Sequence, residues 1–239
     1  MNKTISIQNL NFSYGQKNMI FTDLNLEINN GEFVCIIGPS GCGKSTLLHL
    51  LAGFIKNKSG NICTTHRKSV VFQKHNLFPW KTVLQNIMLG LTTKGSSQTM
   101  AKTRARTYLD FVGLSEHEDK YPYQLSIGMQ QRVGIARAFA EDPELLLMDE
   151  PFGSLDAQTR YKMQQLLFDI WQKESKTIIF ITHDIDEAIL LADRIIVLSN
   201  SPARVKAEIQ LTLPHPRNSQ CLVTREAIEI RKNIFDLLL

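Results

Sequence analysis

Residues 33–52 read FVCIIGPSGCGKSTLLHLLA, and this stretch decides how the rest of the chain is interpreted. An apolar run at 33–37 leads into a glycine-rich turn at 38–46, and apolar residues with helical spacing follow at 47–52. The turn has the form G-x-x-x-x-G-K-[ST] between a strand and a helix, which is the pattern of a phosphate-binding P-loop. A turn that merely joins a strand to a helix would not need all four of these fixed positions. The sequence therefore predicts a site for a nucleoside triphosphate.

Each residue type in this turn has a chemical reason to be there. Gly38, Gly41 and Gly43 let backbone N–H groups curl around a phosphate, because a side chain would collide with its oxygens or forbid the dihedral angles. Lys44 supplies a positive charge for the β- and γ-phosphates, and the hydroxyl of Ser45 is a candidate ligand of Mg²⁺. The helix that follows directs its N-terminal amides at the same anion. The remaining residues of the turn that we expect to contact nucleotide are Ser40, Cys42 and Thr46.

The composition is that of an ordinary globular protein. A chain of 239 residues with 43% hydrophobic and 21% charged side chains can bury the core of one large domain. The net charge of +4 is too mild to indicate a nucleic-acid partner. The four cysteines lack a C-x-x-C spacing, so we expect reduced thiols in a cytosolic protein. No apolar run approaches the roughly 20 residues that span a bilayer, so a membrane role requires a partner.

Three other strand-like runs end in polar side chains. Gln73 follows the run SVVF, Asp149 and Glu150 follow ELLLM, and His183 follows TIIFIT. Because ligands bind at the carboxyl ends of parallel strands, we expect these side chains to share one sheet edge with the phosphate turn. Asp149 is the expected Mg²⁺ ligand, and Glu150 is the group expected to polarise the attacking water. Gln73 can offer its side-chain oxygen to Mg²⁺ or to that water, and His183 can contact the γ-phosphate. The competing interpretations are a surface glutamine, a solvated acidic turn and a structural histidine.

The segments that flank this core have a different character. Residues 5–12 and 19–28 alternate polar and apolar side chains, as half-buried strands do. Tyr14, on the loop between them, can either stack on an adenine ring or fill a core. Residues 76–142 turn to helical spacing and predict an inserted helical lobe, in which Ser126 is placed to cap a helix. The N-terminus of that helix is a second place where an anion can bind, although an ordinary capped helix is the alternative.

Taken in order, these motifs resemble the ATP-binding subunits of ABC transporters over nearly the whole chain. The residues and motifs that carry the resemblance are Tyr14, the P-loop at 38–46, Gln73, LSIGM at 125–129, LLLMDE at 145–150, SLD at 154–156 and His183. Three further stretches are similar to the importer branch for nitrate, sulfonates and taurine, and to its relatives for thiamine-precursor pyrimidines. They are LFPW at 77–80, MDEPFGSLD at 148–156 and LPHPR at 213–217.

The resemblance implies an α/β fold, with a P-loop NTPase core built on a mainly parallel sheet, an N-terminal antiparallel β subdomain and an inserted helical subdomain. It also implies a single ABC ATPase domain over residues 1–239. Residues 1–75 and 143–218 would form the core with its antiparallel part, residues 76–142 the helical subdomain, and residues 219–239 a C-terminal helix.

The resemblance further implies an ATPase that uses ATP and Mg²⁺ to drive the import of a small solute. Two copies would form a head-to-tail dimer with two ATP molecules between them. Each ATP would contact the phosphate turn, Glu150 and His183 of one copy and Ser126 and Gly128 of the other. Asp156 joins the residues expected at the nucleotide.

The implied partners lie at a membrane. Two permease subunits would each dock a short cytoplasmic helix in a groove between the sheet and the helical lobe, beside Gln73 and the segment Phe78–Trp80. The two aromatic residues of that segment can instead be core residues. An extracytoplasmic solute-binding protein would be an indirect partner, and the chain would lie peripherally on the cytoplasmic face of the inner membrane.

One position departs from the family pattern. The family signature reads L-S-G-G, and Ile127 stands at its third position. A β-branched side chain adds bulk and narrows the backbone options where chain and phosphate approach closely. We hypothesise that Ile127 weakens the dimer that holds ATP between its two copies, or slows ATP hydrolysis, compared with a glycine at this position.

The alternative function is that of a soluble ABC ATPase that acts on nucleic acid or ribosomes. Such proteins usually carry two nucleotide domains, long coiled-coil insertions or basic arms, and this chain has one P-loop. The ATPase half of an exporter is typically fused to transmembrane helices. A P-loop kinase for small molecules would not need the motif at 126–129 or His183. The sequence favours the importer, without a nucleic-acid partner.

Overall fold

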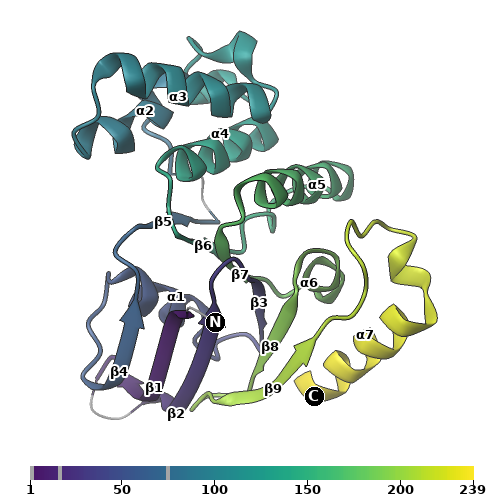
Figure 1. Ribbon diagram of the computed structural model, residues 1–239. Coiled ribbons are helices and arrows are strands. Elements are labelled where there is room, and N and C mark those ends of the chain that lie inside the picture. Colours follow the sequence, from purple (N-terminus) through teal and green to yellow (C-terminus); the bar gives the residue numbers. More distant parts are fainter. Residues whose placement is uncertain (1–2, 16–17, 74–75) are drawn as a thin grey trace.

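Six strands form the central sheet of the protein, and five of them run parallel (Figure 1). The computed structural model describes residues 3–15, 18–73 and 76–239. The strand order is β5-β6-β7-β3-β8-β9, with β9 antiparallel to β8 at one edge. The strands are β3 (Phe33–Ile37), β5 (Lys68–Val71), β6 (Leu145–Asp149), β7 (Thr177–Ile181), β8 (Arg194–Leu198) and β9 (Val205–Gln210).

The central strands are buried on both faces because nearly all their side chains are apolar. In β3, Phe33, Cys35 and Ile37 belong to one hydrophobic core, whereas Val34 and Ile36 belong to the other. A strand of this kind needs a packed layer on each side. The first core extends into α5 (Ala157–Glu174), α6 (Ile185–Leu191) and the helical lobe, and the second extends into α1 (Lys44–Ala52) and a smaller sheet.

The smaller sheet is antiparallel and has the order β2-β1-β4. Its strands are β1 (Lys3–Ser13), β2 (Met19–Asn29) and β4 (Ser59–Thr64). Gly60 brings β4 close to β1, because a Cβ atom at Gly60 would lie 2.5 Å from the carbonyl oxygen of Asn9. The sequence did not predict β4, β9 or α6. The predicted α/β class, with a mainly parallel sheet, an antiparallel N-terminal sheet and a helical insertion, is confirmed.

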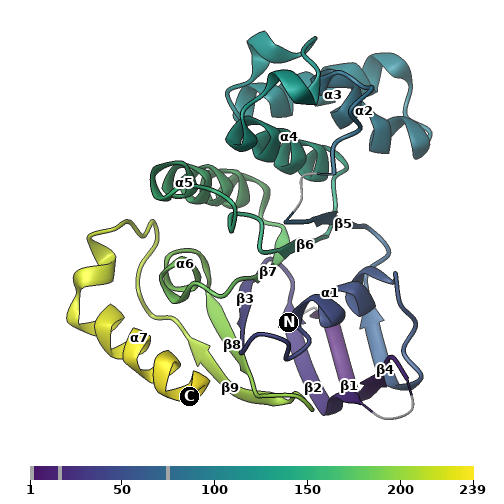
Figure 2. The same cartoon turned by 180° about the vertical axis from the view of Figure 1, so that it is seen from behind.

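Three helices form a lobe that lies beyond the sheet edge near β5 in both views (Figures 1 and 2). They are α2 (Val83–Thr93), α3 (Gln98–Phe111) and α4 (Ile127–Ala140). Each begins at a hydroxyl side chain that accepts a backbone N–H of the first turn, which stabilises the helix start. The capping residues are Thr82, Ser97 and Ser126.

The C-terminal helix α7 (Arg225–Leu238) packs on α6. The chain between β9 and α7 is anchored by Arg217, whose buried guanidinium donates to the carbonyl oxygens of Ile189 at 2.7 Å and Ala192 at 2.6 Å. A cation at the C-terminus of α6 is favourable because the last carbonyls of a helix lack partners. Among the described residues no helix is long and apolar enough to cross a membrane.

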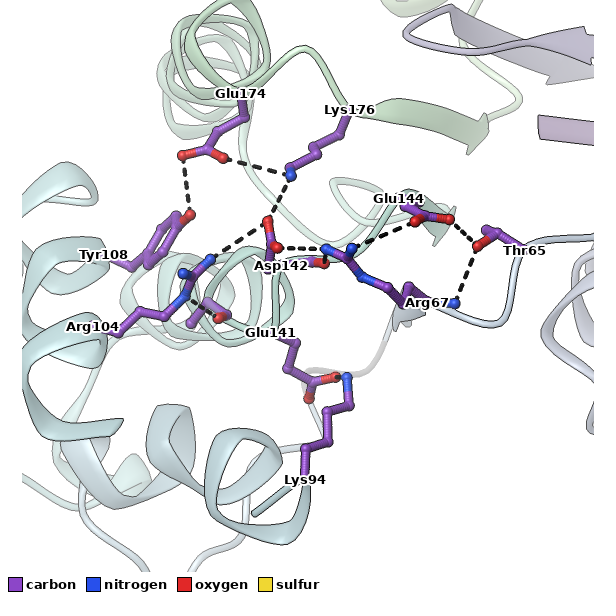
Figure 3. A network of polar contacts seen from close by, with 11 residues as sticks. Thr65, Arg67, Lys94, Arg104, Tyr108, Glu141, Asp142, Glu144, Glu174 and Lys176 are labelled. Atoms are coloured by element: carbon purple, nitrogen blue, oxygen red, sulfur yellow. Dashed lines mark hydrogen bonds and ion pairs between the residues drawn. The ribbon is translucent and has the colours of Figure 1, made fainter. Parts of the chain in front are cut away.

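A network of polar contacts joins the helical lobe to the sheet (Figure 3). Asp142, just after α4, is its centre and has a φ of +53°. Its carboxylate accepts hydrogen bonds from Lys176 Nζ at 2.6 Å and from the guanidinium of Arg67, and Arg104 Nη2 of α3 lies 3.6 Å away. The hydrogen bond from Lys176 holds the pKa of Asp142 below its usual range. These contacts link α3 to the starts of β5 and β7.

Replacing Asp142 by Asn should lower the free energy of unfolding by about 1 kcal/mol at pH 7, as for other partly exposed ion pairs. Asn tolerates a positive φ, so the backbone can stay unchanged. Because the pKa of Asp142 is lower in the folded chain, its stabilisation is present above the unfolded pKa of about 3.9 and is lost as the pH falls through the folded value.

Urea titrations should therefore show a stability gap between wild type and Asp142→Asn at pH 7 that closes below about pH 4. Asp236→Asn is the control, because Asp236 is exposed on α7. A gap of constant size over this pH range would contradict the role given to the Asp142 carboxylate.

Candidate functional site

The phosphate turn packs so closely on its neighbours that side chains are excluded at two glycines. Gly43 has a φ of +106°, and a Cβ atom there would lie 2.5 Å from Cγ2 of Ile20. At Gly38, a Cβ atom would lie 2.9 Å from Sγ of Cys42 and 3.1 Å from Cβ of Leu198. The turn is thus held between β2 and β8, and glycine is needed for this approach. Ser40 and Gly41 lie on its exposed side.

Lys44 is the charged residue of this turn and is only 8% exposed. Its Nζ donates to the carbonyl oxygens of Gly38 at 2.8 Å and Pro39 at 3.0 Å. The ammonium group therefore lies over the turn, where the backbone N–H groups and the start of α1 also favour the binding of an anion. An ammonium with three protons can keep a carbonyl contact and still donate to a phosphate.

Tyr14 lies beside this helix and is not a core residue, since it is 62% exposed. Its hydroxyl is 3.2 Å from Oγ1 of Thr46, and its ring packs edge-on against Phe12 with centroids 5.2 Å apart. An exposed aromatic ring anchored in this way offers a surface on which a flat base can stack. The core-filling alternative for Tyr14 is wrong.

Ser45 and Asp149 meet across the edge of the sheet. The hydroxyl of Ser45 at the start of α1 donates to Oδ1 of Asp149 at the end of β6, at 3.2 Å. Burial raises the pKa of Asp149, and the charge of Glu150 adds to this effect. A cation at this point would relieve that cost. Hydroxyl and carboxylate oxygens are ligands that Mg²⁺ takes together with phosphate oxygens, so the pair fits this ion.

The described residues contain no group of three or more His, Cys, Asp or Glu side chains placed to hold a metal ion. In nucleotide-binding enzymes Mg²⁺ usually takes one or two protein oxygens and completes its ligands with waters and phosphate oxygens.

Glu150 and His183 form the second pair of the site. Oε2 of Glu150 lies 3.2 Å from Nδ1 of His183, which follows β7. Glu150 has a φ of +43°, so the chain turns sharply directly after β6. A Cβ atom placed on Gly153 would be 3.5 Å from Nε2 of Gln73 and 3.7 Å from Oε2 of Glu150, so the Gln73 amide lies beside this pair. The ends of β5, β6 and β7 thus bring Gln73, Glu150 and His183 together.

Sequence reasoning missed the residues that hold the segment around His183. Buried Glu187 accepts hydrogen bonds from Thr182 Oγ1 and from Gln164 Nε2 of α5. Asp184 caps α6 by accepting from the backbone N–H groups of Asp186 and Glu187. The sequence signal was available, because Asp at an N-cap with Glu three residues later marks a helix start.

The remaining predicted residues do not meet the phosphate turn within this chain. Ser126 caps α4 in the helical lobe, and the lobe lies apart from α1 in both views (Figures 1 and 2). Gly128 faces α5, since a Cβ atom there would lie 2.9 Å from Cγ2 of Thr159. The carboxylate of Asp156 caps α5, and its hydrogen bonds with Thr159 lower its pKa.

These features define a P-loop nucleoside triphosphatase with an inserted helical lobe. The model of the ABC transporter family matches residues 21–153, and the chain belongs to this family.

Relatives of the importer branch are similar over most of the chain. The nitrate import ATP-binding protein NrtD of Synechocystis is 45% identical over 216 residues, which are 85% of this chain and 81% of the relative. The aliphatic sulfonates import ATP-binding protein SsuB of Bacillus licheniformis is 43% identical over 227 residues, 91% of this chain and 88% of the relative. The solved dimeric structure of a bacterial ABC transporter cassette has a TM-score of 0.75 and 34% identity, covering 90% of this chain and 99% of that one. The chain is an ATP-binding subunit of the importer type, with ATPase activity coupled to transport.

Replacing Gly43 by Ala should destabilise the fold by roughly 1–3 kcal/mol, because the new Cβ atom clashes with Ile20 and the φ is unsuited to an L-residue. The matched control is Gly15→Ala, where a Cβ atom would meet nothing within 4 Å. Both can be measured as free energies of unfolding in urea titrations. Equal stability of the two variants would show that the turn does not require glycine at position 43.

Proposed function

We propose that this chain is the energy-coupling ATPase of an importer for a small solute, and that it works as a dimer beneath two membrane permease subunits. The solute would be a sulfonate-, taurine- or nitrate-like anion or a pyrimidine-type vitamin precursor. The observation that carries the proposal is the meeting of Lys44, Ser45–Asp149 and Glu150–His183 at one sheet edge, in a chain that is 43–45% identical to import subunits. The domain would comprise residues 1–239.

In the proposed reaction the carboxylate of Glu150 is the general base. It takes a proton from a water molecule while the water oxygen bonds to the γ-phosphorus. The bond between that phosphorus and the bridging oxygen breaks, and the products are ADP and inorganic phosphate. His183, whose Nδ1 lies 3.2 Å from Oε2 of Glu150, would fix the direction of the carboxylate and contact the γ-phosphate with its imidazole ring.

The other side chains of the site bind and orient the nucleotide. Lys44 would hold the β- and γ-phosphates, and Tyr14 would stack on the adenine ring. Ser45, Asp149 and Gln73 would hold Mg²⁺, which when bound neutralises charge on the β- and γ-phosphates. Backbone N–H groups of residues 38–46 would surround the phosphates.

A dimer is proposed because Ser126 and Gly128 are far along the chain from the phosphate turn and do not meet it within one copy. The N-terminus of α4, with its free N–H groups, would complete the ATP site of a second copy. The solved cassette that this chain resembles is dimeric. Asp156, at the start of α5, would lie at the same interface.

The permease would dock in a groove of about 430 Å³ between the sheet and the helical lobe. Phe54, Phe72 and Phe78 line it with apolar surface, and Phe54 is stacked on Phe72. Trp80 is 70% exposed and packs edge-on against Phe78, so the core alternative does not describe it. We expect a short permease helix to cover these rings, which would place the chain peripherally on the cytoplasmic face of the membrane. A solute-binding protein would act through the permease.

Replacing Glu150 by Gln should leave ATP binding intact and slow hydrolysis by about 10²- to 10⁴-fold, because an amide cannot accept the proton of water. Phosphate release and nucleotide titration measure the two effects separately. Lys44→Ala is the matched comparison, since it should lose ATP binding. Hydrolysis by Glu150→Gln at the wild-type rate would remove Glu150 as the general base.

The importer role is tested by recovering tagged Glu150→Gln from native membranes with Mg-ATP and identifying the bound proteins by mass spectrometry. A polytopic permease and a solute-binding protein are expected. Recovery of ribosomal or DNA-associated proteins instead would replace the transport role by the alternative of a soluble ABC ATPase.

Replacing Ile127 by Gly should speed ATP hydrolysis in the assembled transporter by up to about tenfold. This factor corresponds to roughly 1.4 kcal/mol in the free energy of closing the dimer around ATP. Ile127 is the first residue of α4 and is 56% exposed, so its loss removes little core packing. Ile127→Ala is the control, because it removes the β-branch without adding the freedom of glycine. An unchanged rate of ATP hydrolysis in Ile127→Gly would contradict the hypothesis that Ile127 weakens the ATP-bound dimer.

A further inference from the structure

Arg160 of α5 contacts both segments that carry the proposed catalytic pair. Its Nη1 donates to Oδ2 of Asp184 at 3.2 Å, and its Nη2 donates to the carbonyl oxygen of Leu155 at 3.1 Å. Asp184 directly follows His183, and Leu155 lies at the end of the turn that begins at Glu150. One guanidinium group therefore joins the chain after β6 to the chain after β7.

Little else holds His183 in place. Its side chain is 67% exposed and contacts the carboxylate of Glu150. Its position therefore depends on its two neighbours in the chain. Thr182 is fixed by Glu187, and Asp184 is fixed by Arg160 and by its role as the cap of α6.

The turn after Glu150 depends on the same arginine. It is closed by short-range backbone hydrogen bonds, from Gly153 to Glu150 at 3.2 Å and from Leu155 to Phe152 at 3.1 Å. Arg160 binds the free carbonyl at the end of this turn, and its own N–H bonds the carbonyl of Asp156 at 2.8 Å in the first turn of α5.

The side chains also surround a common space. Glu150, His183, Arg160 and Glu187 line a small cavity of about 10 Å³, which is about the volume that one water molecule needs. Nε of Arg160 is buried and has no hydrogen-bond acceptor among the residues that the structure describes. Arg160 thus lines the same small cavity as the Glu150–His183 pair.

We propose that Arg160 is a positioning residue for ATP hydrolysis. Its planar guanidinium ties Leu155 to Asp184, and so keeps the Glu150 carboxylate and the His183 imidazole at hydrogen-bonding distance. Lysine is a poor replacement, because all its donors are on one nitrogen, whereas the two acceptors of Arg160 are bound by two separate nitrogens of a planar group. The inference rests on the roles proposed above for Glu150 and His183.

The test compares MgATP hydrolysis by the full chain and its Arg160→Met, Arg160→Lys and Asp184→Asn variants. Arg160→Met should lower kcat by about 10- to 100-fold, as expected for a misplaced catalytic group, and leave KM for ATP within about twofold. Arg160→Lys should lower kcat by nearly the same factor. Asp184→Asn keeps the helix cap, since Asn caps as well as Asp, and should show a smaller loss of kcat. Arg225→Met, at a residue whose side chain is 94% exposed on α7, should match wild type.

A double variant separates positioning from a general structural role. If Arg160 acts through His183, Arg160→Met combined with His183→Ala should hydrolyse ATP no more slowly than His183→Ala alone. A double variant that is slower than His183→Ala by the full factor seen for Arg160→Met would overturn the inference. So would an Arg160→Met variant whose kcat is within twofold of wild type.

If His183→Ala itself keeps the wild-type rate, the proposed role of His183 is wrong, and the inference about Arg160 is wrong with it. If thermal unfolding shows that Arg160→Met does not fold, the kcat values of Arg160→Lys and Asp184→Asn test the inference instead, and wild-type kcat in both would overturn it.

Discussion

The requirement that the inner strands be buried on both faces governs the whole molecule. β3, β6 and β7 carry almost only apolar side chains, so each must be covered from two sides and none can present a polar group along its length. Polar residues can therefore occur only where these strands end. Since the strands are parallel and adjacent in the order β6-β7-β3, their carboxyl ends lie side by side. The phosphate turn, Asp149–Glu150 and His183 meet at one edge for this reason.

The same arrangement leaves the site held together by few direct contacts. Ser45, at the start of α1, hydrogen-bonds Asp149 at the end of β6, and Glu150 after β6 pairs with His183 after the neighbouring strand β7. The residues that keep these ends in register lie one layer behind, on α5 and α6. Arg160, Gln164 and Glu187 belong to helices that follow the very strands they support. Helix packing on the sheet is thereby coupled to the geometry of the reacting edge.

A second set of contacts concerns the helical lobe. It meets the core through the Asp142 network and through the groove lined by Phe54, Phe72 and Phe78 (Figure 3). Partly exposed ion pairs are weak individually, and the hydrophobic core shared by the sheet and the lobe adds to this junction. The lobe carries Ser126 and Gly128, which a single chain leaves apart from the phosphate turn.

The sequence by itself determined the phosphate turn, the polar strand ends and the α/β class. These follow from local patterns, since a buried strand, a glycine turn and a capped helix each leave a signal within a few residues. Tertiary structure alone decided the rest. The strand β4 has little apolar pattern, whereas β9 alternates apolar and polar residues, and it is the pairing with β8 that places β9 at the sheet edge. Arg160 contacts Asp184, 24 positions away, and whether Tyr14 is core or surface depends on α1 packing beside it. Such contacts arise only when helices and strands pack, so no pattern of neighbouring residues encodes them.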